Sequence, residues 1–468
     1  MKADVKVILL SLTTVLLLVF PIQQVSGLFK FKKLHGVVNE TPKPKLTAQH
    51  WIDHSFQDDA EAYLQQHYGF REPLTRLYNQ YLWDFYGLTF AKERNWVFVS
   101  DDGWYYESNN VREYYEGNSW KYASDSLKMA QILGKEALML SQIQQILSDL
   151  DTHLFVVLEP GKELVCPEHI PANKMYHHDK VFSAHHFLHQ RFETLGINYI
   201  DMGEWFLQMK DTADFPLFPQ TGTHWSNLAA MYVGDSLIRY MEALGDMNIL
   251  NYEIGPKYAK TKEPDNDLEE WLNLMRPLKG QPNYYATTRI VDDPTAAKPK
   301  LITIGDSFYW NITNHTPFRK IFGSTPYWYY FSTAYFDGPD KSVADLDLLE
   351  EVAEADFVML AYSTPQQYEM SNGFAKRFLM EWCYDDDEIE PLLLKMKERI
   401  RNDKPWMGRI VEKAESQGLP VDSVLDREAT YFVEKRPEAC FAALADSVPL
   451  KRSSKAEHIL LTQKGPQQ

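Results

Sequence analysis

The stretch KPKLITIGDSFYWNI, residues 298–312, joins an apolar run to a small polar triplet and then to aromatic residues. Leu301 to Ile304 are apolar and favour β structure, so they predict a buried strand, and the aromatic residues that follow suit a buried helix face. In an open α/β sheet, ligands bind outside the carboxyl ends of the strands, where helix N-termini present free N–H groups. Ser307 occupies such a place, although Asp and Ser are also ordinary helix caps.

Strand and helix patterns alternate around this stretch. Apolar residues at three- and four-residue intervals predict a long helix over residues 124–149, and the sequence HLFVVLEP after it predicts a strand. The same rhythm continues with strands expected at 197–202, 301–307, 326–332 and 356–363 and helices at 180–194, 308–321 and 343–354. We therefore predict an α/β fold, a parallel sheet with helices on both faces.

The remaining parts of the chain differ from this core. Residues 49–88 carry apolar positions at helical spacing, and WVFVSDDGWYYES, residues 96–108, predicts a hairpin around an Asp-Gly turn. From about residue 385 only helical patterns follow, which predicts a helical appendage. We divide the chain into a signal segment, an N-terminal helical and hairpin part, an α/β core, and a C-terminal helical appendage with its tail, at residues 1–27, 28–123, 124–384 and 385–468.

The first 27 residues have the layout of a secretory signal. Lys2 and Lys6 precede a 14-residue, mostly apolar run from Val7 to Phe20, and small residues lead to Gly27. Because a membrane-spanning helix needs about 20 apolar residues, cleavage after Gly27 is favoured over a retained anchor. We expect an exported protein of the periplasm or cell envelope, with membrane anchoring by this segment as the alternative.

Composition excludes several classes of function. Lys and Arg total 48 and Asp and Glu total 65, so the formal net charge is −17, which argues against binding to a nucleic-acid backbone. No Walker or Rossmann glycine loop appears, and we predict no cofactor. The 3 cysteines form no CxxC pair, and His185 and His189, four residues apart in HHDKVFSAHHFLHQ, favour a partly packed helix over a metal site.

A serine nucleophile needs a base, and FPQTGTHWSNLAAMYVGDSLI, residues 218–238, offers His224. This histidine follows a Gly-Thr turn, and an amphipathic helix is expected from Ser226. The imidazole would thus be held at a helix start, a placement that suits a general base. A core or capping histidine is the alternative.

The motifs THWS and IGDSF, together with FVVLEPGKELVCPEHIP and DGWYYES upstream, resemble the alginate O-acetyltransferase family, the AlgX/AlgJ-like branch of SGNH-hydrolase proteins. The resemblance covers roughly residues 45–380, and the histidine motif precedes the serine motif as in that family. It implies an SGNH-hydrolase-like sheet, Ser307 as nucleophile, His224 as base and a loop around Lys162 and Glu168 near the cleft.

The resemblance also implies what the protein does. Members of the family are exported and transfer acetyl groups to polysaccharide hydroxyls, and a membrane-bound acyltransferase partner supplies the acetyl group. We expect the same substrate and partner here. A carbohydrate acetylesterase that uses the same Ser-His dyad and a non-catalytic polysaccharide-binding scaffold stay open as alternatives. Asp306, Lys162, Asp214 and Trp225 are further candidates for substrate binding or orientation.

One position departs from the family pattern. Alginate-modifying members carry Asp two positions before the histidine, and here that position is Gly222. Loss of the Asp from a serine triad lowers the rate by about 10⁴, because the imidazole tautomer is no longer enforced. Three interpretations stay open. His224 is oriented by a backbone carbonyl or by another carboxylate, of which Asp214 and Asp211 are nearest in sequence. Alternatively, His224 and Ser307 work as a dyad without a third residue, or the domain only binds glycan.

Overall fold

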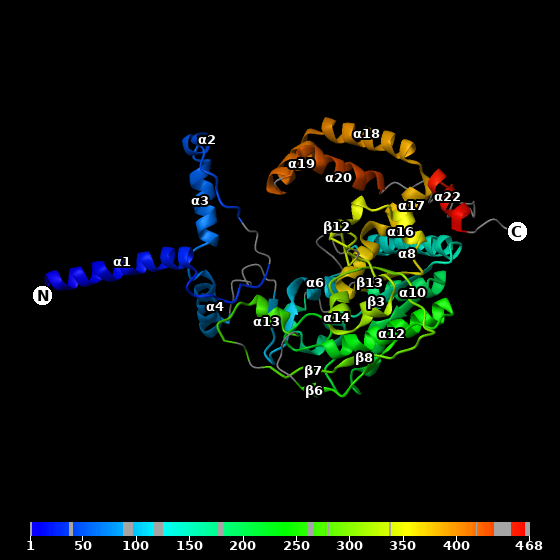
Figure 1. Cartoon of the computed structure of the whole chain (residues 1–468), viewed down its shortest axis with the longest axis horizontal. Coiled ribbons are helices and arrows are strands. Elements are labelled where there is room, and N and C mark those ends of the chain that lie inside the picture. The colour runs from blue at the N-terminus through cyan, green and yellow to red at the C-terminus, as the bar shows by residue number, and fades with distance from the viewer. Residues whose placement is uncertain are drawn as a thin grey trace. The chain divides into compact units, whose positions relative to one another are not determined.

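The computed structural model describes the chain except for residues 1, 37–40, 88–96, 117–124, 176–181, 260–264, 277, 279, 337, 418, 435–450 and 464–468. Figure 1 follows the chain from blue at the N-terminus to red at the C-terminus. The chain divides into two compact units. The smaller unit comprises Met1–Asn109, Pro219–Thr223 and Thr261–Pro282, and the larger comprises Asn110–Phe218, His224–Lys260 and Asn283–Gln468.

The larger unit is built on a seven-stranded sheet of order β12-β11-β10-β9-β13-β3-β4. Four neighbouring pairs, β10 with β9, β9 with β13, β13 with β3 and β3 with β4, run parallel. The predicted strands at the centre are confirmed. In sheet order the strands are Lys341–Ser342, Thr333–Tyr335, Tyr327–Tyr329, Leu301–Gly305, Phe357–Ser363, His153–Glu159 and Tyr199–Asp201.

One edge of the sheet is antiparallel, which the expectation of a parallel sheet did not include. β11 pairs antiparallel with β10 and with β12. The strand predicted at 326–332 ends at Tyr329, because Tyr330 and Phe331 adopt positive φ angles of 48° and 50° and turn the chain back. A connection this short joins antiparallel strands, since a parallel crossover needs a dozen residues or more. The sheet is therefore mixed.

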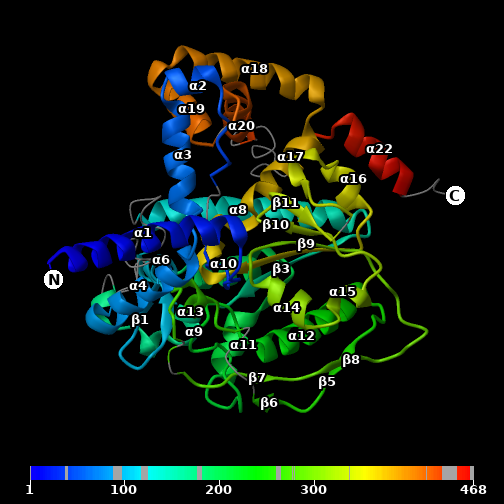
Figure 2. The ribbon, with the colours of Figure 1, turned by 60° about the vertical axis from the view of Figure 1, so that its left-hand side comes forward.

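Helices cover both faces of the sheet, as predicted. On one face, Leu154, Val156 and Leu158 of β3 share a core with α8 (Ser126–Ser148), α10 (Ala184–Leu195) and α17 (Phe374–Cys383). On the other face, Phe155 packs against Tyr240 of α12 (Asn227–Gly245), with ring centroids 5.3 Å apart. Figure 2 shows α8 and α12 on opposite sides of the strands. The central strands are buried on both faces, which explains their continuous apolar sequences.

The helix expected at 308–321 is interrupted. It forms α14 (Tyr309–His315) and α15 (Phe318–Ile321), separated by Thr316 and Pro317. Thr316 has an extended backbone, with φ −124° and ψ 163°, because a residue before proline is disfavoured in the helical region. The Thr316 hydroxyl accepts the first N–H of the second helix, that of Phe318, at 3.1 Å.

The C-terminal region is helical, as expected. α18 (Asp386–Asn402), α19 (Lys404–Gln417) and α20 (Val421–Glu434) bury a core of their own. A capping box of Asp385 and Glu388 begins α18. After residues outside the described part, α22 (Ser454–Gln463) packs on α17 and on α16 (Leu348–Ala353).

The smaller unit contains the predicted hairpin and helices. β1 (Val97–Val99) and β2 (Tyr105–Glu107) pair antiparallel and pack on α13 (Asp267–Trp271). The segment Pro219–Thr223, which precedes His224, also belongs to this unit. The unit also contains α1 (Lys2–Ser26) and the helices α2 (Ala48–Ile52), α3 (Ser55–Gln66) and α4 (Arg71–Tyr86).

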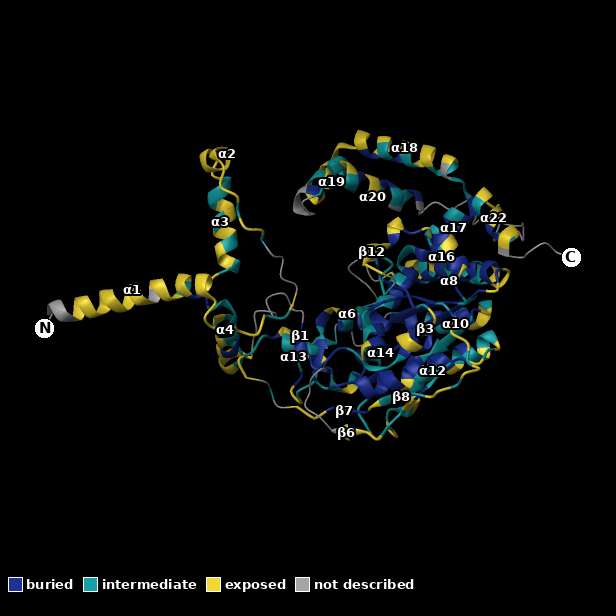
Figure 3. Cartoon of the chain, in the orientation of Figure 1, coloured by how far each residue is buried: buried dark blue, intermediate teal, exposed yellow. Residues whose placement is uncertain are grey.

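The first helix, α1 (Lys2–Ser26), is longer than the apolar run in the sequence indicates. Its segment Val5–Ser26 has 22 residues and a mean hydropathy of 2.4, and by length and composition it is sufficient to cross a membrane. The helix continues through Pro21, so the apolar segment does not end at Phe20. In Figure 3 most of this helix is yellow, that is exposed, whereas the central strands are dark blue. Its length suits an anchor as well as a signal peptide.

Short elements complete the larger unit. The remaining helices are α6 (Ser108–Glu116), α9 (Lys162–Val165) and α11 (Met202–Met209), and the 3₁₀ segments are Pro167–His169, Ala172–Lys174, Val343–Asp345 and Thr364–Gly373. Two small antiparallel pairs join β5 (Tyr252–Ile254) to β8 (Thr288–Ile290) and β6 (Tyr258–Ala259) to β7 (Tyr284–Tyr285).

Packing on α8 gives a direct test of the core. Leu140 is fully buried against the sheet, whereas Leu127 on the same helix is 76% exposed. We expect Leu140→Ala to lower the free energy of unfolding by about 2–5 kcal/mol, since it removes buried methyl groups and leaves a cavity. Leu127→Ala, the matched control, should change it by less than about 0.5 kcal/mol. Urea unfolding of both variants measures the difference, and equal losses would contradict this packing.

Candidate active site

Ser307 lies on a tight turn at the carboxyl end of β9. Strand β9 ends at Gly305, where a side chain would overlap the carbonyl oxygen of Ala361 on the neighbouring strand β13. The N–H of Asp306 donates to that same carbonyl at 3.2 Å. Glycine is therefore required by the close approach of β13. The turn leads directly from the sheet to a partly exposed serine.

The buried side chain of Asp306 holds this turn in place through hydrogen bonds. Its carboxyl group is 1% exposed and accepts three hydrogen bonds. The Phe308 N–H donates to Oδ1 at 3.0 Å, and Ser363 donates to Oδ2 from its backbone N–H at 2.8 Å and from its hydroxyl at 2.6 Å. Asp306, one of the residues singled out in the sequence, thus joins the serine turn to the end of β13.

His224 faces Ser307 directly. The distance from His224 Nε2 to Ser307 Oγ is 2.8 Å, a hydrogen bond in which the serine hydroxyl donates when Nε2 is unprotonated. Phe308 packs edge-on against the imidazole, with centroids 4.9 Å apart. The indole N–H of buried Trp225 donates to the Phe308 carbonyl at 3.2 Å. The two predicted residues are brought together, and Trp225 braces the segment that carries the histidine.

A second link joins the serine helix to the histidine segment. Asn311 of α14 donates through its amide to the Trp225 carbonyl at 3.3 Å and to Asn227 Oδ1 at 3.4 Å. Ser226 caps the following helix α12 by accepting the Ala229 N–H at 3.2 Å. These bonds hold the serine and histidine segments in register with each other.

The N–H of Ser307 is the donor best placed for a developing negative charge. The next three N–H groups are engaged within the turn: Phe308 bonds the Asp306 carboxylate, Tyr309 bonds the Asp306 carbonyl and Trp310 bonds the Ser307 carbonyl. Among the described residues, the Ser307 N–H donates to no acceptor. A donor beside the nucleophile that is free to bind substrate oxygen is what an oxyanion site requires.

Glu159, at the end of β3, is a buried acid behind the serine turn that the sequence did not single out. It stands opposite Ser363 in the sheet register and is 1% exposed. Burial and the nearby Asp306 carboxylate raise the pKa of Glu159 well above its ordinary value. Burial also raises the pKa of Asp306, although the three hydrogen bonds that its carboxyl group accepts act in the opposite direction and lower it. We therefore assign the proton to Glu159 and the negative charge to Asp306, whose charge favours a protonated His224.

The other predicted residues lie on segments that follow β3 and α11. Lys162 begins α9 and is buried, 2% exposed. Asp214 is 78% exposed and forms an ion pair with Lys257. Glu168 pairs with Lys210 at 2.7 Å. These contacts leave Asp214 and Glu168 as surface ion pairs.

The histidine-rich helix forms a cluster around one carboxylate. Asp201 Oδ2 is 2.7 Å from His189 Nδ1 and 3.2 Å from His185 Nε2. The described residues contain no group of three or more His, Cys, Asp or Glu side chains arranged for a metal ion. His177, His178 and Asp179 of the same motif lie outside the described residues. Cys166 and Cys383 are buried and form no disulfide with each other.

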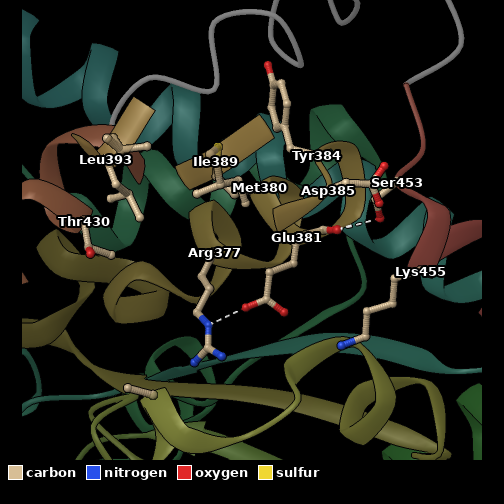
Figure 4. Close-up of a pocket in the computed structure, with 12 residues that line it drawn as sticks. Arg377, Met380, Glu381, Tyr384, Asp385, Ile389, Leu393, Thr430, Ser453 and Lys455 are labelled. Atoms are coloured by element: carbon tan, nitrogen blue, oxygen red, sulfur yellow. Dashed lines mark hydrogen bonds and ion pairs between the residues drawn. The ribbon is translucent and has the colours of Figure 1, made fainter. Parts of the chain in front are cut away.

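A cavity of about 340 Å³ lies in the C-terminal half of the larger unit, away from the Ser-His pair. Figure 4 shows Arg377 and Glu381, one turn apart on α17, side by side among the residues that line it, and their Nε to Oε1 distance is 2.7 Å. The Arg377 guanidinium also donates to two backbone carbonyls, and Lys455 pairs with Asp347. These charged groups join α17 to neighbouring segments, and neither Ser307 nor His224 lines the cavity.

Comparisons with known proteins agree with the fold and the motifs. Residues 97–310, which include His224 and Ser307, match a family model described as "SGNH hydrolase-like domain, acetyltransferase AlgX". The chain is thus similar to the alginate O-acetyltransferase family over this range, and the SGNH-hydrolase-like fold is confirmed. No curated protein sequence matches the chain.

Solved structures show the same similarity at low identity. The O-acetyltransferase domain of Pseudomonas putida AlgJ is 16% identical, covers 58% of this chain and 92% of its own, and has a TM-score of 0.37. Pseudomonas aeruginosa AlgX is 13% identical, with coverages of 60% and 66% and a TM-score of 0.38. Bacillus cereus PatB1 is 10% identical, with coverages of 59% and 99% and a TM-score of 0.35.

The raised pKa of Glu159 predicts a pH-dependent stability. Above the unfolded pKa of a glutamate, about 4.3, the folded state retains a proton that the unfolded chain releases. The free energy of unfolding should therefore fall as the pH rises from about 4.3 toward the folded pKa. Glu159→Gln keeps the shape but cannot ionise, so part of this decrease should vanish.

Urea unfolding at pH 4, 6 and 8 measures this effect. Relative to wild type, Glu159→Gln should gain stability as the pH increases. Glu457→Gln, which alters an exposed glutamate, is the control and should follow wild type. Parallel pH profiles for Glu159→Gln and wild type would show that Glu159 is ionised in the folded protein.

Proposed function

We propose that the protein is an exported O-acetyltransferase that moves an acetyl group through Ser307 to hydroxyls of a cell-envelope or extracellular polysaccharide. The single observation that carries this proposal is the 2.8 Å hydrogen bond between His224 Nε2 and Ser307 Oγ at the carboxyl edge of the sheet. The match of residues 97–310 to an acetyltransferase family model supports acetyl transfer as the chemistry. A serine paired with a general base is the arrangement that acyl transfer requires.

In the first step, His224 Nε2 takes the proton of Ser307 as Oγ attacks the carbonyl carbon of an acetyl ester. The tetrahedral intermediate carries its negative charge on the former carbonyl oxygen, which the Ser307 N–H stabilises. When the intermediate collapses, the bond to the donor alkoxide breaks and the imidazolium returns the proton to that leaving group. The products are a free donor alcohol and an acetyl group on Ser307.

In the second step, a sugar hydroxyl replaces the donor alcohol. His224 accepts its proton, the sugar oxygen attacks the acetyl carbon, and Ser307 Oγ leaves and regains a proton from the imidazolium. The buried Asp306 carboxylate favours the imidazolium in both steps, since it attracts the positive charge without contacting the reacting atoms. The net result is an acetyl ester on the polysaccharide and a regenerated enzyme.

The remaining parts of the proposal concern place and partner. The N-terminal helix, with a mostly apolar segment of 22 residues that is long enough to cross a membrane, supports export or membrane anchoring. A membrane-bound acyltransferase that supplies the acetyl group fits a protein held at the membrane surface. The net charge of −17 favours an uncharged or cationic glycan over nucleic acid.

An acetylesterase is the second candidate function, favoured by the exposure of the site. Ser307 and His224 are both partly exposed, so water can reach the acetylated serine unless a bound glycan excludes it. The same two residues and the same acetyl-enzyme serve either acceptor. The ratio of transfer to hydrolysis in the presence of an oligosaccharide distinguishes the two functions.

The acetyl-enzyme is the central prediction. We expect the purified protein from Leu28 onward, incubated with p-nitrophenyl acetate, to gain one acetyl group on Ser307 by mass spectrometry. Ser307→Ala and His224→Ala should abolish the adduct, since they remove the nucleophile and its base. Addition of an acceptor oligosaccharide should discharge the adduct faster than water alone, with acetylated sugar as the product.

The chain contains a matched control for this experiment. A second Gly-Asp-Ser triplet occupies residues 234–236 inside α12, where the Ser236 hydroxyl donates to the Tyr232 carbonyl at 2.9 Å. Ser236→Ala should leave the adduct unchanged. An unmodified wild-type protein between pH 6 and 9, or an adduct that persists in Ser307→Ala, would argue for a binding scaffold instead.

A further inference from the structure

Gly222, the position at which the sequence departs from the family, is in close contact with α13. A Cβ atom placed on Gly222 would lie 2.6 Å from Asp267 Oδ1, 2.9 Å from the Asp265 carbonyl oxygen and 3.0 Å from Pro219 Cγ. Contacts below 3.0 Å are not tolerated by real side chains, and one of these neighbours is backbone. Position 222 therefore has no room for an aspartate, because the start of α13 and its carboxylate occupy that space.

The same helix start is bonded to the chain on either side of Gly222. The Thr223 N–H donates to Asp267 Oδ1 at 3.0 Å, and the Glu269 N–H donates to the Thr221 carbonyl at 3.1 Å. The Thr221 hydroxyl donates to the Asp265 carbonyl at 3.4 Å. Residues 221–223 are all buried, so their backbone groups depend on these partners rather than on water.

A carboxylate that fixes this segment also fixes the residue that follows it. His224 is joined to Thr223 by one peptide bond, and Nε2 must meet Ser307 Oγ within hydrogen-bond distance to act as a base. A bond from a backbone N–H to a charged oxygen is stronger than one between neutral groups, so Asp267 is an effective clamp for the Thr223 peptide. The two carboxylates nearest in sequence do not bond this segment: Asp214 pairs with Lys257 and Asp211 is exposed.

We infer that Asp267 is a positioning residue of this site, one that holds the Gly222–Thr223 backbone and thereby sets the orientation of His224. The inference rests on the proposed function and adds to it the residue that compensates for glycine at position 222. Asp267 acts through the peptide backbone in this assignment and is not a catalytic residue.

The experiment measures the rate of acetylation of Ser307 by p-nitrophenyl acetate in the full chain. Asp267→Ala removes the clamp and should lower the rate about 10²-fold, the cost of a displacement of about 1 Å in a reacting group, with little change in the KM for the ester. Asp267→Asn keeps an oxygen that accepts the Thr223 N–H and should retain most of the rate. Glu270→Ala, on the same helix and bonded to Lys32, is the matched control and should behave as wild type.

A second variant disturbs the same contact by a change at Gly222 instead of Asp267. Gly222→Ala places a Cβ against Asp267 Oδ1 and the Asp265 carbonyl, so it should displace the segment and slow acetylation to a similar extent. Thermal unfolding of each variant shows whether the fold persists, and only variants that keep the wild-type transition are compared. Rates in Asp267→Ala and Gly222→Ala that equal wild type would overturn the inference.

Amide hydrogen exchange at Thr223 keeps the inference testable apart from the chemistry. In Asp267→Ala this amide should exchange about tenfold faster, the effect of one lost hydrogen bond, while Asp267→Asn and Glu270→Ala stay close to wild type. If wild type forms no acetyl adduct, the proposed function fails, and the exchange result alone decides whether Asp267 clamps the segment. Unchanged exchange in Asp267→Ala would overturn the inference even if acetylation slowed.

Discussion

The hydrogen bonds of the buried Asp306 carboxylate are the constraint on which the rest of the site depends. They join the turn that carries Ser307 to Ser363 at the end of β13, and Ser363 in turn stands opposite Glu159 of β3. Three parallel strands thus end at one buried polar cluster. Because the sheet fixes these ends, the position of the nucleophile is set by the rigid part of the fold rather than by a loop, which is how a precise site is best supported.

Local patterns predicted most of this framework, and the failures have local causes. The long helix α8 and the strand β3 were predicted because their apolar residues follow helical and buried-strand patterns without interruption. The strand expected at 326–332 was too long, because Tyr330 and Phe331 turn the chain with positive φ angles. Such angles are usually indicated in a sequence by glycine, and neither position is glycine. Glu159 was missed because a carboxylate at a strand end looks exposed until the neighbouring strands bury it. The one signal that pointed to it was its place at the carboxyl end of a predicted parallel strand.

The two Gly-Asp-Ser triplets show how much a motif depends on its context. Residues 234–236 lie in the middle of α12, where Asp235 pairs with Arg239 and Ser236 bonds the preceding helical turn. Residues 305–307 follow a buried strand, where glycine permits close approach, aspartate bonds the adjacent strand and serine meets a histidine. The composition is the same in both places. Only residues 305–307 lie at the carboxyl edge of the parallel strands, and this position is what allows their serine to meet a histidine.

The glycine at position 222 illustrates a limit of reasoning from motif spacing. Spacing along the chain locates residues that act on a neighbour two or three positions away, and by that criterion an expected carboxylate is absent here. In space, the volume that its side chain would fill holds the carboxylate of Asp267, 45 residues later in the sequence, bonded to the Thr223 N–H. A change at one position then follows from the packing of a distant helix, since glycine is what allows α13 to approach. The departure from the motif and the close packing of α13 are therefore one structural feature, and the sequence alone shows only half of it.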